Sequence, residues 1–181
     1  MLVCFDATVL CGALRRPTGP NFRLLELAAE GVVVEGFTTE VVGMEFVRNA
    51  LEGLGGVQYE IAVVEEFLDA FGALFDPDRV ATSPVGRSLT NQTWLHNRPI
   101  GEVVYHLTGK TRADLLADLP TQLRVVSGEF DAYDVHLVAA AVARGADVIC
   151  RANRRRLPEG RLAGNVHVIG PGRRAVDLGI A

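Results

Sequence analysis

Four acidic residues occupy positions where an ordinary surface role does not readily explain a carboxylate. Asp6 ends the apolar run Val3-Cys4-Phe5, Glu45 lies at the edge of an apolar helix face, and Asp131 and Asp134 open an Ala-rich helix. A buried charge costs free energy unless it is paired or bound to a metal. We therefore predict these four residues to be catalytic.

Gathered carboxylates repel one another, and a hard divalent cation with oxygen ligands stabilises their ionised form. Mg²⁺ or Mn²⁺ is the expected cofactor, held by Asp6, Glu45 and Asp134. Such a metal can activate a water for in-line attack on a phosphodiester without a nucleophilic side chain. This agrees with the lack of a convincing Ser-His-Asp or Cys-His arrangement in the sequence.

Each of these acids also has a structural explanation. Asp6 could cap a helix or turn, and Glu45 could be a salt-bridged surface residue. Asp131 is equally well placed to be an N-cap, and Asp134 would then lie in the first helical turn, where acids suit the helix dipole. The site interpretation of Asp134 therefore depends on Asp6 and Glu45.

Alternating strand and helix patterns predict the fold class. Strand-like runs occur at 2–5, 32–37, 123–126, 148–150 and 166–169, and helix-period patterns lie between most of them. Thr38 or Thr39 can cap the helix that carries Glu45. This alternation predicts a three-layer α/β/α sandwich with a mainly parallel central sheet, whose ligand site lies at the carboxyl ends of the strands.

The length of 181 residues favours a single domain over residues 1–181. A variable or inserted segment is expected around 76–120, in which 76–99 resembles a loop and two helices follow at 100–107 and 111–119. No apolar run reaches the roughly 18 residues of a membrane span. We expect a cytoplasmic protein without membrane contact.

The net charge of −4 argues against a uniformly basic nucleic-acid binder, but the chain is locally basic after residue 150. Arg154, Arg155 and Arg156 form a run that is either a solvated face or a phosphate-binding loop. Trp94 and Tyr133 could stack on bases, although lone aromatic residues more often belong to a core or an interface.

Together these residues resemble the PIN-domain family, in particular the VapC-type toxin ribonucleases of toxin-antitoxin pairs. The resemblance covers the opening Val3-Cys4-Phe5-Asp6-Ala7-Thr8, the helix with Glu45, and the stretch from Asp131 to Pro158, and it omits roughly the middle third. It implies a PIN-like sandwich with a metal-dependent ribonuclease site, a homodimer and an antitoxin protein partner.

The chain departs from the family pattern after the strand at 148–150. Arg151 stands where the family usually has Thr or Ser, Asn153 is retained, and Arg156 replaces the usual last Asp. An arginine at that last position would weaken metal binding by Coulomb repulsion. Because this loop borders the predicted metal site, we predict RNA contacts from Arg151, Asn153, Arg154 and Arg155.

Three functions compete at this stage. The leading hypothesis is a Mg²⁺- or Mn²⁺-dependent endoribonuclease that acts as the toxin of a toxin-antitoxin pair. The alternative is a catalytically impaired PIN-domain protein that binds RNA or a protein partner without cleavage. A phospho-acceptor or small-molecule domain that uses Asp6 is weaker, because no phosphate-binding Gly-rich loop is present.

Overall fold

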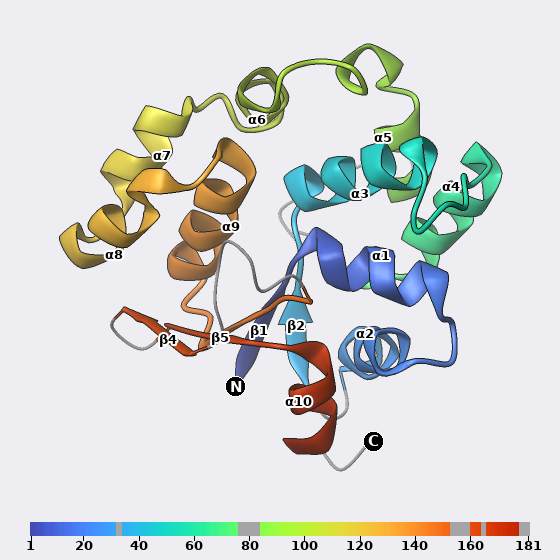
Figure 1. Cartoon of the computed structure of the whole chain (residues 1–181), viewed down its shortest axis with the longest axis horizontal. Helices are drawn as coiled ribbons and strands as arrows, with labels where there is room; N and C mark the ends of the chain where they lie inside the picture. The colour runs from blue at the N-terminus through green and yellow to red at the C-terminus, as the bar shows by residue number, and fades with distance from the viewer. Residues whose placement is uncertain (32–33, 76–83, 153–159, 164–165, 178–181) are drawn as a thin grey trace.

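The structure is a computed structural model that describes residues 1–31, 34–75, 84–152, 160–163 and 166–177 (Figure 1). These residues form an α/β protein with a five-stranded sheet of order β2-β1-β3-β5-β4. The strands are β1 (Leu2–Phe5), β2 (Glu35–Phe37), β3 (Val148–Cys150), β4 (Gly160–Ala163) and β5 (Val166–Ile169). Strands β2, β1, β3 and β5 are parallel, and β4 joins the edge antiparallel to β5.

Helices flank this sheet. The first group is α1 (Ala7–Arg15), α2 (Pro20–Glu30), α3 (Glu40–Glu52), α4 (Ile61–Ala70) and α5 (Val85–Thr90), with the 3₁₀ turns η1 (Gly72–Leu74) and η2 (Thr93–Leu95). The second is α6 (Ile100–Thr108), α7 (Arg112–Asp118), α8 (Thr121–Val126), the 3₁₀ turn η3 (Ser127–Glu129), α9 (Ala132–Ala143) and α10 (Pro171–Asp177). Figure 1 shows α9 on one side of the strands and α2 with α10 on the other.

The central strands are almost entirely apolar because neighbours cover both of their faces. Val3, Cys4 and Phe5 are buried, as are Ile149 and Cys150 on the adjacent strand. All three cysteines are buried, and Cys4 and Cys150 belong to the apolar core.

The sheet register places two charged residues side by side. Phe5 of β1 pairs with Cys150 of β3, so Asp6 and Arg151 follow adjacent strands at equivalent positions. The backbone N–H of Asp6 donates to the Cys150 carbonyl at 3.1 Å, and that of Arg151 donates to the Ile169 carbonyl at 2.9 Å. The carboxyl edge of the sheet therefore brings an acid and a base together.

Most predicted elements occur, but the structure differs from the prediction in several places. The run at 123–126 was predicted as a strand but belongs to α8, which begins after Pro120, and the Arg124 N–H bonds to the Pro120 carbonyl at 2.9 Å. The segment 76–99 was predicted as a loop or a partly ordered insertion, and its described part, 84–99, contains α5 and η2. Helices α1 and α10 and strand β4 were not predicted. No helix among the described residues is long and apolar enough to cross a membrane.

Candidate functional site

An arginine lies between two of the predicted metal ligands. The Arg151 side chain is 5% exposed, and its Nη1 is 2.7 Å from Oδ1 of Asp134, while its Nε is 3.2 Å from Oδ2 of Asp6. Asp6 and Asp134 are also buried. A guanidinium thus bridges the carboxylate at the end of β1 and the carboxylate on the first turn of α9.

Thr8 links this ion-pair cluster to the backbone after β3. Its hydroxyl donates to Oδ2 of Asp6 at 2.6 Å and accepts the Ala152 N–H at 3.0 Å. Asp6 precedes α1 in extended conformation, but its side chain makes no capping hydrogen bond. Asp6 is therefore the N-cap residue of α1 by position, but its carboxylate contacts Thr8 and Arg151 instead of a helix N–H group.

Burial raises the pKa of Asp134, and the negative charge of Asp6 raises it further. The Arg151 guanidinium opposes both effects through its charge and its hydrogen bond. The ion pair therefore compensates part of the free energy that burial of this carboxylate costs, as a bound cation would.

A cavity of about 340 Å³ lies beside the cluster, between α3 and α9. Helix α3 contributes residues at the spacing i, i+3, i+4 and i+7, which places them on one helix face. The cavity is lined by Thr8, Glu45, Arg48, Asn49, Glu52, Ile100, Asp131, Tyr133, Asp134 and Arg151. Four of these side chains are carboxylates and two are guanidiniums, so acidic groups outnumber basic ones in the cavity.

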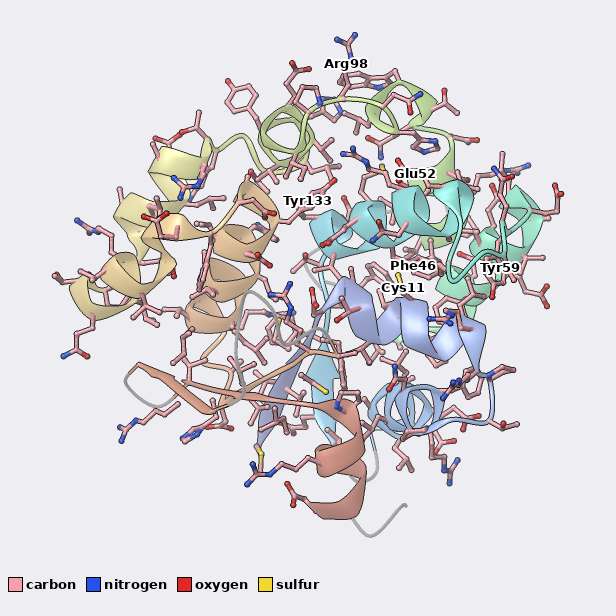
Figure 2. The ribbon with its side chains drawn as sticks, viewed as in Figure 1. Cys11, Phe46, Glu52, Tyr59, Arg98 and Tyr133 are labelled. Atoms are coloured by element: carbon pink, nitrogen blue, oxygen red, sulfur yellow. The ribbon has the colours of Figure 1, made fainter. Side chains whose placement is uncertain are left out.

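One wall of the cavity joins α3 to α9. Arg48 donates from Nη1 to the Tyr133 hydroxyl at 2.9 Å, and its guanidinium carbon lies 5.9 Å from the centre of the Tyr133 ring. Tyr133 reaches from α9 toward α3 (Figure 2). Burial raises the pKa of its phenol above the ordinary value, although Arg48 opposes the shift. Tyr133 is buried, so it presents little of its ring to a base.

Asp131 has the capping role that its position allowed. It is the N-cap of α9, and its Oδ1 accepts the Asp134 N–H at 3.0 Å. Glu45 is partly buried and lines the same cavity as Asp131 and Asp134. The structure therefore brings Glu45, Asp131 and Asp134 to one cavity, whereas Asp6 contacts Arg151, which also lines that cavity. Asn153, Arg154, Arg155 and Arg156 lie outside the described residues.

These side chains do not fit the metal that the resemblance implies. A divalent cation between Asp6 and Asp134 would meet the Arg151 guanidinium, and two like charges repel strongly in a buried site. Among the described residues, no three His, Cys, Asp or Glu side chains form a group that could hold a metal ion. The cationic role at this sheet edge belongs to Arg151.

The residues around Glu45 were not identified from the sequence. Arg48, Asn49 and Glu52 follow it at helical spacing, and this pattern would have extended the site along α3. Ile100 carries no polar signal, and only the packing of α6 brings it to the cavity. Comparison of the chain with protein-family models, curated proteins and solved structures found no match.

Proposed function

We propose that this chain is a PIN-like protein that binds RNA without hydrolysing it. The buried ion-pair cluster of Asp6, Arg151 and Asp134 carries this proposal, because an internal guanidinium takes the place that a catalytic cation would need. The arrangement accounts for two acids that would otherwise be costly to bury, without a metal.

The resemblance to PIN domains and the basic composition after residue 150 support RNA as the ligand. Arg151 is engaged inside the protein, but Arg154, Arg155, Arg156, Arg161, Arg173 and Arg174 follow it in the sequence. Phosphate contacts from such residues supply affinity that falls as salt concentration rises. The experiment must distinguish RNA from a protein as the ligand. The homodimer and the antitoxin partner stay predictions.

The competing function is a Mg²⁺- or Mn²⁺-dependent ribonuclease. It requires the Arg151 side chain to leave the carboxylates and a metal to replace it. Glu45, Asp131 and Asp134 share a cavity from which water could reach such a metal. Cleavage and binding assays on the same RNA separate the two functions.

We expect the protein to bind single-stranded RNA with an affinity that falls with added salt and to leave the RNA intact in millimolar Mg²⁺ or Mn²⁺. The physical reason is that no activated water is available while Arg151 occupies the position between Asp6 and Asp134. Fluorescence anisotropy of an end-labelled RNA measures binding, and denaturing gels of the same samples measure cleavage.

Asp6→Asn and EDTA serve as controls. Cleavage that appears in Mn²⁺ and disappears both in EDTA and in Asp6→Asn would contradict the proposal and restore the nuclease. Absence of RNA binding at low salt would contradict the choice of RNA as ligand.

A further inference from the structure

An exposed aromatic surface lies on the outside of α6 and the turn before it. Trp94 is 50% exposed and Tyr105 is 56% exposed, although large aromatic side chains are usually buried. The Trp94 and His106 rings pack edge to face with their centres 4.6 Å apart. We call Trp94, Arg98, Tyr105 and His106 the aromatic face.

The fold holds this face in place. Val103 and Val104 of α6 are fully buried, as is Leu95 next to Trp94. Exposed Glu102, Tyr105 and His106 lie on the opposite side of the same helix, at spacings of three and four residues. The exposure of the aromatic rings therefore follows from the amphipathic packing of α6 and is not a consequence of a loose chain end.

The sequence segment that carries the aromatic face is more basic than the chain as a whole. Between residues 84 and 110 it has the basic residues Arg87, Arg98 and Lys110 and a single acid, Glu102, whereas the chain has a net charge of −4. Lys110 pairs with Asp118 at 2.6 Å, which compensates its charge. Arg98 lies 3.8 Å from Glu102, and both side chains are more than half exposed. Figure 2 shows Arg98 at the outer edge of the molecule. Such a loose surface ion pair leaves the guanidinium accessible to a phosphate.

We propose that the aromatic face binds single-stranded RNA, with bases stacked on Trp94 and Tyr105 and a backbone phosphate held by Arg98. Unstacked bases pack on aromatic rings without regard to sequence, and nearby arginines hold the backbone. This inference rests on the proposed function and identifies the surface that binds the RNA. The neighbouring cavity, in which carboxylates outnumber guanidiniums, is a poor site for a phosphate.

Trp94 is the single tryptophan of the chain, so its fluorescence reports directly on this surface. Titration with a single-stranded oligouridylate is expected to quench the tryptophan emission, whereas an RNA duplex of equal length, whose bases are stacked internally, is expected to quench it much less. Trp94→Ala should weaken oligouridylate binding about tenfold or more in anisotropy measurements.

Charge variants test the phosphate contact. Arg98→Ala should weaken binding and reduce its dependence on salt. Glu102→Gln should tighten binding, because it removes the one acid of this segment. Arg23→Ala is the matched control: Arg23 forms an exposed ion pair with Glu26 at 3.1 Å on α2, far from α6 in Figure 1, and the variant should bind as the wild type does.

The outcomes distinguish this inference from the function on which it rests. RNA binding that leaves tryptophan emission unchanged and survives Trp94→Ala and Tyr105→Ala would overturn the aromatic face and leave the RNA-binding proposal standing. No binding of RNA by the wild type would overturn both. Equal binding of duplex and single strand, unaffected by Arg98→Ala, would show that the face serves another ligand, such as a protein.

Discussion

Replacement of Arg151 by alanine is expected to lower the free energy of unfolding by about 3–5 kcal/mol, because the variant leaves buried carboxylates without their countercharge. Asp6 and Asp134 both lie within 3.2 Å of the Arg151 guanidinium, and all three side chains are buried. Urea unfolding of wild type and variant at pH 7 measures the difference.

The loss should depend on pH in a defined direction. Arg151 lowers the pKa of Asp134 against the effect of burial, so its removal raises that pKa further. Protonation at lower pH then neutralises the carboxylate, and the variant should recover stability relative to the wild type as pH falls from 7 toward 5.

Arg23→Ala serves as the control. It breaks the exposed Arg23–Glu26 pair and should lower the free energy of unfolding by less than about 1 kcal/mol. An Arg151→Ala loss as small as that of Arg23→Ala, without pH dependence, would show that the bridge contributes little to the folded state.

Acidification is expected to destabilise the wild type through His136 by about 3 kcal/mol, a value that follows from its pKa shift. Burial lowers the pKa of His136 from 6.5 to about 4. Below pH 6.5 the unfolded chain therefore takes up a proton that the folded chain does not. Neutral His136 makes its full contribution to the free energy of unfolding above pH 6.5, and this contribution is lost as pH falls toward 4.

The surroundings of His136 explain why its charged form is disfavoured. Its Nε2 is 3.0 Å from Oγ1 of Thr39, the N-cap of α3, and its buried Nδ1 has no hydrogen-bond partner among the residues that the structure describes. The small cavity that it lines also contains the Lys110–Asp118 ion pair, whose charges already compensate each other.

Urea unfolding of wild type and His136→Gln at several values between pH 7.5 and 4 tests this prediction. The variant lacks the titrating ring and should lose about 3 kcal/mol less than the wild type over this range. His167→Gln is the control, because His167 is exposed on β5, and it should follow the wild type. Parallel stability curves for the wild type and His136→Gln would contradict the account.

The sequence was most informative where local chemistry determines the conformation. Asp131 and Thr39 were predicted as possible helix caps, and both accept the capping N–H bond. The run at 123–126 was predicted wrongly because three apolar residues in a run of four cannot distinguish a strand from a helix turn, and Pro120 sets the start of the helix. Strand β4 has the sequence Gly-Arg-Leu-Ala, which carries little strand preference, and pairing with β5 forms it.

The acidic residues of the candidate site were predicted from the sequence, but the Arg151 guanidinium between two of them was not. Asp6, Glu45, Asp131 and Asp134 were identified, yet Arg151 was expected to contact RNA and Arg156 was expected to disturb the metal. The register Phe5 with Cys150 places Asp6 beside Arg151, and such pairing between distant segments is not visible in a sequence taken alone. A basic residue directly after a buried strand was the available signal.

Crystals soaked in Mn²⁺ test the central claim most directly through anomalous scattering from the metal. We expect no anomalous peak between Asp6 and Asp134, and electron density for the Arg151 guanidinium at that position. Arg151→Thr, which removes the guanidinium from between the two carboxylates, provides the comparison crystal for Mn²⁺ entry. A wild-type peak at metal-ligand distance from both carboxylates, with Arg151 displaced, would contradict the account.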